Sequence, residues 1–229
     1  MLYMPFDSLY LFLVLPAFIF SMWAQYRVKS GFKKYSNQRT LSGKTGAEAA
    51  RDVLFSAGVT HVGIERIGGS LTDHFDPAAN VIRLSDGVYN STSVAAVGIA
   101  AHEAGHAVQY AKGYSPMKLR AAIIPVTNIG SKLSTPLIIL GLVLGMTGLI
   151  NIGILLFGAV VVFQLVTLPV EFNASSRALT LLETSGVLTA AEIPASKKVL
   201  SAAALTYVGA LAVSLAQLVR FIAMSQRRR

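Results

Sequence analysis

Long uncharged apolar segments dominate the pattern of hydrophobic and polar positions along the chain. Residues 8–24 form an apolar run between Asp7 and a basic stretch that starts at Arg27. No positively charged region precedes this run and no small-residue cleavage site follows it, so we expect a retained membrane helix and not a signal peptide. The positive-inside rule places the N-terminus outside and predicts that residues 27–44 are a solvated basic connector in the cytoplasm.

A second apolar stretch, residues 137–168, contains no charged residue. At about 1.5 Å per residue it is too long for one ordinary span, and a break near residues 145–151 predicts a membrane hairpin over residues 134–168. Its loop carries no Lys or Arg, as expected of a loop outside the cytoplasm. Residues 200–223 form a last apolar run and predict either a fourth span or an interfacial helix, because a span would place three basic residues outside: Arg227, Arg228 and Arg229.

Shorter alternations of apolar and polar residues follow the first basic stretch. Residues 45–57 predict an amphipathic helix. Three short strands are predicted at residues 62–67, 71–75 and 81–84, and a loop rich in turn-forming residues joins the last two. We therefore expect a small α+β part, in which a strand is well placed to hold an extended substrate by strand pairing.

A zinc helix is predicted at residues 92–112, with Ser91 or Thr92 as the residue that caps its start. Within it, His102 and His106 belong to an H-E-x-x-H motif. Residues four apart lie on one face of a helix, with their β-carbons about 6 Å apart. Two imidazole nitrogens at this spacing can reach one tetrahedral Zn²⁺, so the motif predicts a zinc site.

A catalytic zinc site also uses a base and a third protein ligand. Glu103 cannot easily reach the same coordination position as its neighbour His102, but it can take a proton from water as the general base. Glu171 follows the long uncharged stretch and is the predicted third ligand, because the membrane hairpin folds its helix back beside the zinc helix. Otherwise Glu171 is only an interfacial carboxylate, and four side chains compete for the ligand role: His74, Asp73, Asp76 and Glu183.

Hydrolysis of a peptide bond further requires a donor that stabilises the oxyanion. The sequence offers three candidates, which are His74, Tyr110 and Arg177. His74 has the best claim, because its strand would have to line the cleft, although it can also cap the turn that follows. Tyr110 and Arg177 have simpler roles open to them, in packing and in contact with lipid headgroups respectively.

Composition supports a membrane protein. The 229 residues are 53% hydrophobic and only 14% charged, and the mean hydropathy is +0.57, which is too apolar for a soluble domain of this size. The net charge of +9 comes from basic residues that cluster at the ends of apolar segments, so we expect contact with anionic lipid headgroups and no nucleic-acid partner. The chain has no cysteine, which excludes disulfides, thiolate nucleophiles and cysteine–zinc sites.

Five stretches carry a resemblance to a known family: LTDHFDP at residues 71–77, LS at 84–85, SVAA at 93–96, AHEAGHAVQ at 101–109 and PVEFNAS at 169–175. In this combination the chain resembles the YugP-like neutral zinc metallopeptidases of bacterial membranes. The resemblance covers nearly the whole chain and is far more specific than the H-E-x-x-H motif alone. It implies a zinc-dependent peptidase with its catalytic part at the cytoplasmic face.

The chain also looks like the wider group of membrane peptidases that includes HtpX and the CAAX prenyl proteases. In that group a zinc-ligand Glu follows the H-E-x-x-H motif, and an Asp lies four residues after this Glu. Glu171 matches the ligand, but Ser175 stands where the Asp would be. A serine can accept an imidazole N–H without adding negative charge. Asn173, or a carboxylate such as Asp73 or Asp76, is then a candidate to orient a ligand.

Together these features predict a mainly α integral membrane protein with about four membrane helices and a small cytoplasmic α+β zinc peptidase part. Residues 27–132 would form the catalytic part, and residues 169–198 a cytoplasmic helix that carries the third ligand. The predicted function is hydrolysis of peptide bonds, in peptides or membrane proteins, near the cytoplasmic membrane face.

Three other classes of protein compete with this function. A catalytically silent zinc-binding scaffold gains nothing from Glu103. A transporter with a metal site would have polar residues along its spans. A zinc hydrolase that acts on lipid or amide bonds stays open.

Overall fold

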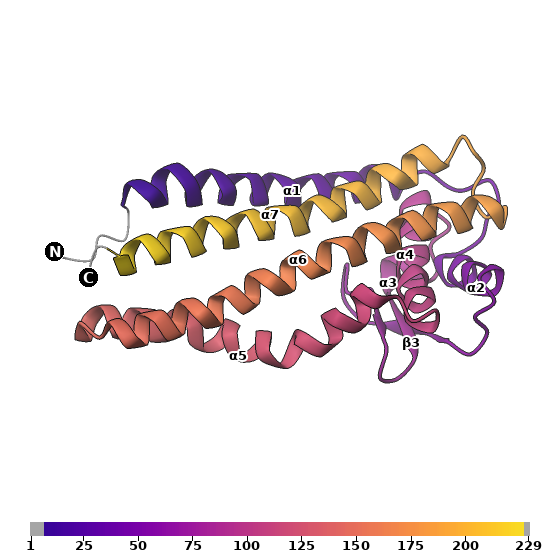
Figure 1. The fold of residues 1–229 in the computed structure, drawn as a ribbon. Coiled ribbons are helices and arrows are strands. Elements are labelled where there is room, and N and C mark those ends of the chain that lie inside the picture. Colours follow the sequence, from indigo (N-terminus) through magenta and orange to yellow (C-terminus); the bar gives the residue numbers. More distant parts are fainter. Residues whose placement is uncertain (1–6, 227–229) are drawn as a thin grey trace. The chain divides into compact units, whose positions relative to one another are not determined.

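The computed structural model describes residues 7–226 of the chain (Figure 1). These residues fall into two compact units. The apolar unit contains residues 7–24, 119–168 and 205–226, and the mixed unit contains residues 25–118 and 169–204. Arg227, Arg228 and Arg229, which bear on the predicted topology, lie outside the described residues.

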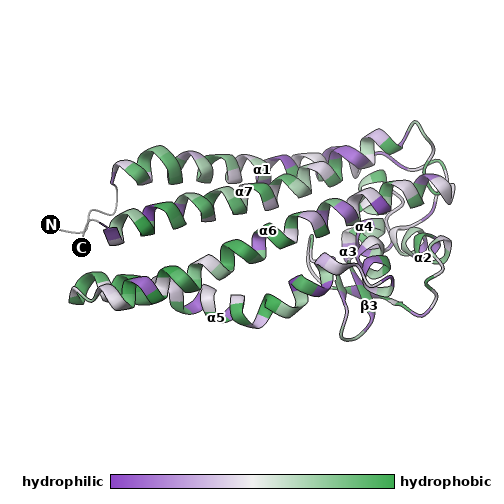
Figure 2. Cartoon of the chain, in the orientation of Figure 1, coloured by the Kyte–Doolittle hydropathy of each residue, from purple (hydrophilic) through white to green (hydrophobic). Residues whose placement is uncertain are grey.

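Four helical segments of the described chain are long and apolar enough to cross a membrane. They are the π-helix η1 (Tyr10–Val14) with the adjoining α1 (Leu15–Tyr35), α5 (Ser115–Leu144), α6 (Thr147–Thr184) and α7 (Ile193–Gln226). Much of their length is green in Figure 2, the colour of hydrophobic residues. The prediction of a mainly α membrane protein with about four membrane helices is therefore confirmed.

The first long helix extends further than the apolar run that predicts it. Instead of giving way to a connector near Arg27, α1 continues to Tyr35, so the expectation of a connector over the whole of residues 27–44 is wrong. Lys33 and Lys34 occupy the last turn of α1, where positive charge interacts favourably with the helix dipole. The basic residues thus stabilise the end of the helix instead of interrupting it.

In the apolar unit, α5 and α6 form an antiparallel pair around a turn at Gly145, which has a φ of 70°. A β-carbon on Gly130 would lie 2.6 Å from the backbone oxygen of Leu156, and one on Gly153 would lie 2.8 Å from that of Ser134. Only residues without a side chain permit such an approach of two backbones. The pair is therefore packed through small residues, as membrane helices commonly are.

The last helix, α7, contains the whole of residues 200–223. Its Arg220 donates to the Asp7 carboxylate, with an Nε–Oδ1 distance of 3.2 Å, and its guanidinium lies 5.2 Å from the centre of the Tyr10 ring. In the same unit, a β-carbon on Gly209 would lie 2.9 Å from the α-carbon of Ser21 in α1. The end of α7 thus lies beside the start of the first helix, as an even number of antiparallel spans requires.

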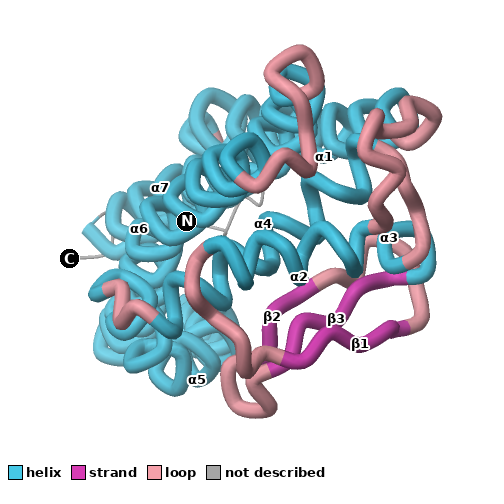
Figure 3. Tube along the Cα trace, turned by 90° about the vertical axis from the view of Figure 1, so that its right-hand side faces the viewer, coloured by secondary structure: helices cyan, strands magenta, loops and turns pink. Residues whose placement is uncertain are grey.

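The mixed unit contains one small sheet of three strands, β1 (Gly63–Ile67), β2 (His74–Asp76) and β3 (Val81–Ser85), shown side by side in Figure 3. The strand order is β1-β3-β2, with β1 parallel and β2 antiparallel to β3, so β2 is an edge strand. The sequence predicts that the second strand begins at Leu71, but in the structure it begins at His74. Leu71 has a φ of 56°, and Gly69, two residues earlier, has a φ of 106°. These are turn conformations that cannot continue into a strand.

Three helices complete the mixed unit: α2 (Gly46–Ser56), α3 (Asp86–Tyr89) and α4 (Val94–Ala111). The start of α4 is capped by Ser93, whose hydroxyl accepts the N–H of Ala96 at 3.2 Å, so the expected caps Ser91 and Thr92 are wrong. The backbone oxygen of Thr92 instead accepts the N–H of Thr40 at 2.9 Å. Thr40 lies in a distant segment, so this hydrogen bond cannot be predicted from the sequence around Thr92.

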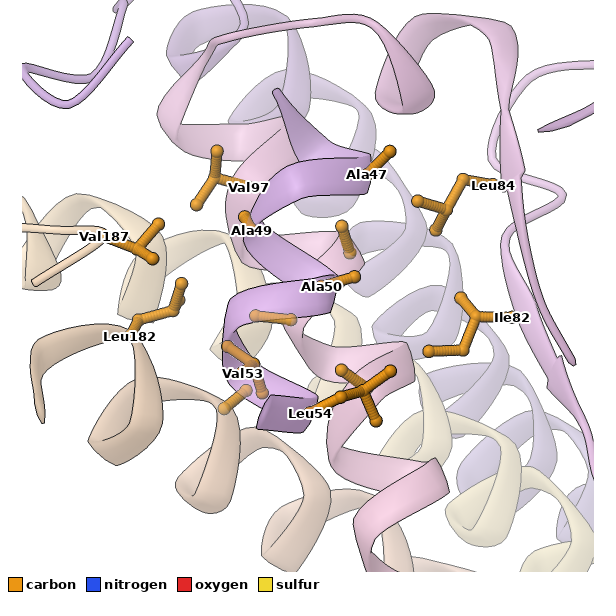
Figure 4. Close-up of a cluster of buried hydrophobic side chains, with 14 of the residues drawn as sticks. Ala47, Ala49, Ala50, Val53, Leu54, Ile82, Leu84, Val97, Leu182 and Val187 are labelled. Carbon is orange, nitrogen blue, oxygen red and sulfur yellow. The ribbon is translucent and has the colours of Figure 1, made fainter. Parts of the chain in front are cut away.

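The core of the mixed unit forms around α2 and α4. Figure 4 shows side chains from α2 meeting others from β3, α4 and the end of α6. Small residues dominate α4, and fourteen of its eighteen residues are buried. Other elements can therefore approach this helix closely on several sides.

Candidate metal centre

Two imidazoles project from one face of α4, as the spacing in the sequence predicts. The rings of His102 and His106 lie 4.6 Å apart, centre to centre. The carboxylate of Glu171 on α6 approaches both, with Oε2 3.2 Å from Nε2 of His102 and 3.5 Å from Nε2 of His106. In residues 7–226 these three side chains are the group that could hold a metal ion, with ligand atoms all within 4.8 Å of one another.

The approach of α6 to α4 depends on a glycine inside the motif. A β-carbon on Gly105 would lie 2.6 Å from the backbone oxygen of Ala174. Any side chain here would meet backbone, which cannot swing aside. Gly105 therefore lets the turn of α6 that carries Glu171 come close enough for its carboxylate to face the two imidazoles.

Both imidazoles are held at their second nitrogen. His102 Nδ1 lies 3.1 Å from the hydroxyl oxygen of Ser175, and His106 Nδ1 lies 3.1 Å from Oε1 of Gln109. Ligand histidines in metalloproteins are commonly oriented in this way, by a hydrogen bond at the nitrogen that does not bind the metal. The Nε2 atoms then face Glu171, where a shared cation would be bound.

The electrostatics of the site favour a positive charge between these groups. Burial of His106 alone would lower its pKa, but the nearby carboxylates of Glu171 and Glu103 outweigh burial and hold the pKa above its ordinary value. Glu171 itself is only 2% exposed, and a buried carboxylate requires such partners. Two imidazoles and one carboxylate are also the donor set of many catalytic zinc sites, so these residues fit Zn²⁺.

Glu103 lies beside this group without joining it. Its side chain is buried, and its Oε2 accepts the backbone N–H of Phe75 in the edge strand β2 at 3.0 Å. The Phe75 ring contacts the ring of Tyr110, with 5.8 Å between the ring centres. The motif's carboxylate therefore connects the metal-binding face of α4 to the edge strand of the sheet.

The other proposed ligands have different partners. Asp73 accepts the N–H and hydroxyl of Ser85, and Asp76 pairs with Arg83 at 2.7 Å. His74 Nδ1 lies 2.8 Å from the carbonyl oxygen of Thr72. Neither these three residues nor Glu183 belongs to the group of described residues that could hold a metal.

The remaining candidates fall into two sets. Asn173 and Arg177 belong to a hydrogen-bond network behind His106, in which Arg177 Nε donates to Asn173 Oδ1 at 2.7 Å. Tyr110 is 52% exposed and packs on Phe75. Of the candidates for the oxyanion, His74 directly precedes Phe75, whose N–H contacts Glu103, while the Arg177 guanidinium also lies over the Tyr114 ring.

Two contacts at the site were not predicted from the sequence. Gln109 stands three residues after His106, a spacing that places both on one face of a helix, and this signal could have identified it. The donor to Glu103 is a backbone N–H, which cannot be predicted from the type of residue that carries it. It becomes visible only when β2 is placed beside α4.

Comparison with known proteins adds independent information. Residues 10–226 match the family described as "Putative neutral zinc metallopeptidase". The chain is also 49% identical over 214 residues to "Putative membrane protease YugP" of Bacillus subtilis (strain 168), a match that covers 93% of this chain and 95% of that protein. No solved structure matches the chain significantly.

Proposed function

Since the chain belongs to the neutral zinc metallopeptidase family, we propose that it is an endopeptidase with His102, His106 and Glu171 as zinc ligands and Glu103 as general base. Its four apolar helices and its membrane relative make it a multi-pass membrane protein. The observation that carries the proposal is the convergence of two Nε2 atoms on the Glu171 carboxylate, with the Glu103 carboxylate near enough to help raise the pKa of His106.

Each side chain has a defined part in the proposed reaction. Zinc held by the three ligands supplies Lewis acidity, which makes water more acidic and polarises the carbonyl group of the substrate. Glu103 accepts a proton from the attacking water and passes it to the leaving amine as the peptide bond breaks. The N–H of Phe75 holds the Glu103 carboxylate at the edge of the sheet, 3.0 Å away.

The edge strand β2 is the proposed docking element for the substrate. Extended peptides can pair with edge strands through backbone hydrogen bonds. The exposed Tyr110 and the Phe75 ring offer apolar surface beside Glu103. His74, the residue before Phe75, is our candidate donor to the oxyanion.

A cytoplasmic location of the site is also part of the proposal. It is supported by the basic residues Lys33 and Lys34 at the end of α1 and by the lack of Lys and Arg in the α5–α6 turn, which is the distribution that the positive-inside rule describes. A bilayer and a peptide or membrane-protein substrate are the partners that such an enzyme needs.

Replacement of Glu103 by Gln tests the enzyme against a silent zinc scaffold. The amide keeps the size of the side chain but cannot accept the proton of water, so we expect zinc content to stay at one ion per chain while peptide hydrolysis falls by a factor of at least about 10². Metal analysis and cleavage of a fluorogenic peptide library measure the two effects.

Glu65→Gln, which changes an exposed carboxylate on β1, is the matched control and should cleave like the wild type. If Glu103→Gln retains both zinc and full turnover, the assignment of the base is wrong.

A further inference from the structure

A fully buried amide lies behind the candidate metal centre. Gln109 on α4 has 0% exposure, and both atoms of its amide have partners. Its Oε1 lies 3.1 Å from Nδ1 of His106, while its Nε2 donates to the backbone oxygen of Val170 at 2.8 Å and to Oδ1 of Asn173 at 3.0 Å. Neither the H-E-x-x-H motif nor the third ligand accounts for this residue.

The direction of each hydrogen bond follows from chemistry alone. A backbone carbonyl such as that of Val170 can only accept, so the NH₂ group of Gln109 faces it. The amide oxygen then faces His106, and because this oxygen can only accept, Nδ1 of His106 carries a proton. In the neutral imidazole the lone pair is therefore on Nε2, the atom 3.5 Å from the Glu171 carboxylate.

The same amide ties the two elements of the site together. Val170 precedes Glu171 directly and Asn173 follows it by two residues. Gln109 is therefore hydrogen-bonded to the turn of α6 that carries the third ligand. Oδ1 of Asn173 also accepts from Arg177 Nε at 2.7 Å, which fixes which end of the Asn173 amide faces Gln109. The network thus leaves Gln109 with one orientation.

We propose that Gln109 is a positioning residue of the metal centre. It selects the tautomer and ring orientation of His106 and holds the Glu171 turn against α4. This inference rests on the proposed function, because it assumes that His106 and Glu171 bind zinc. Ser175 at His102 is a weaker constraint, since a hydroxyl can donate or accept and selects no tautomer.

Zinc affinity of the full-length protein, measured by competition with a chelator, tests this role without reference to turnover. Gln109→Leu keeps the approximate volume but removes every hydrogen bond of this side chain, and we expect zinc affinity to fall about 10–100-fold, as for other residues that orient metal ligands. Val108→Ala, which trims the adjacent buried residue on the same helix, should stay within about 3-fold of wild type.

Gln109→Glu separates positioning from packing. A carboxylate still accepts the N–H of His106 but loses the donation to Val170 and Asn173. A positioning role exerted through His106 therefore predicts tighter zinc binding for Gln109→Glu than for Gln109→Leu. A purely packing role predicts the reverse order, because a charge is costlier than a leucine at a fully buried position. Equal or reversed affinities would overturn the role of Gln109 at His106.

Two comparisons keep the outcomes distinct. If wild type binds no zinc, or His106→Ala binds it equally well, the proposed function fails. If His106→Ala loses zinc but Gln109→Leu does not, only the role of Gln109 fails. If Gln109→Leu does not fold, Gln109→Asn replaces it, since its amide is one methylene too short to span the network. A loss of at least about 10-fold is then expected, and unchanged affinity contradicts the proposal.

Discussion

At the scale of single residues, the site is a small set of polar groups whose protonation depends on one another. His106 has a raised pKa because Glu171 and Glu103 outweigh the effect of its burial. A metal ion binds the neutral imidazole, so protons and zinc compete for the same nitrogen. The raised pKa makes the proton a stronger competitor than at an exposed histidine.

This competition predicts how zinc binding depends on pH. Without metal, the stabilisation from His106 is fully present below its unfolded pKa and is lost as pH rises through the higher folded pKa. Zinc stabilises the opposite, deprotonated form. The melting temperature of zinc-saturated protein minus that of chelator-treated protein should therefore grow as pH rises through the pKa of His106, which lies above the ordinary 6.5. A difference that is the same on both sides of this pKa would contradict the account.

At the scale of elements, the site depends on how closely two helices approach. Gly105 brings α4 against the backbone of α6, and the edge strand β2 brings an N–H to Glu103. Neither contact is local in sequence. Replacement of an apolar residue between these elements can therefore move the polar side chains of the site and alter its chemistry.

Gly105→Ala tests whether the close approach of α4 and α6 places Glu171. The added methyl group would lie 2.6 Å from the backbone oxygen of Ala174, so α6 must shift and carry Glu171 away from the imidazoles. We expect a loss of stability of about 1–3 kcal/mol from overpacking and a fall in zinc affinity of about 10-fold or more.

Gly31→Ala is the matched control for this change. A β-carbon on this α1 residue meets no heavy atom within 4 Å, so it should gain up to about 1 kcal/mol from helix propensity. Unfolding monitored by circular dichroism, together with chelator competition, measures both variants. If Gly105→Ala binds zinc like the wild type, close helix approach is not what places Glu171.

At the scale of the whole molecule, the sequence predicts the classes of element well and their exact limits less well. Long uncharged runs predict membrane helices because hydropathy and length alone decide them. The cap of α4 at Ser93 and the start of β2 at His74 differ from prediction, because a backbone contact with a distant segment holds Thr92 and a left-handed turn precedes β2.

The candidate site divides in the same way. The i, i+4 spacing places His102 and His106 on one face, and Glu171 was the expected third partner from the end of an apolar run. The N–H of Phe75 could not be assigned a role, since its partner lies on another element. For Gln109 the spacing from His106 is visible in the sequence, but its contacts with Val170 and Asn173 on α6 are not.

The central claim is that one zinc ion is held by the two motif histidines and Glu171, and metal analysis of the purified protein tests it most directly. We predict one zinc per chain in wild type, loss of zinc in Glu171→Ala, and full occupancy in Glu183→Ala, which removes an exposed carboxylate from the same helix. Full zinc content with undiminished affinity in Glu171→Ala would contradict the account.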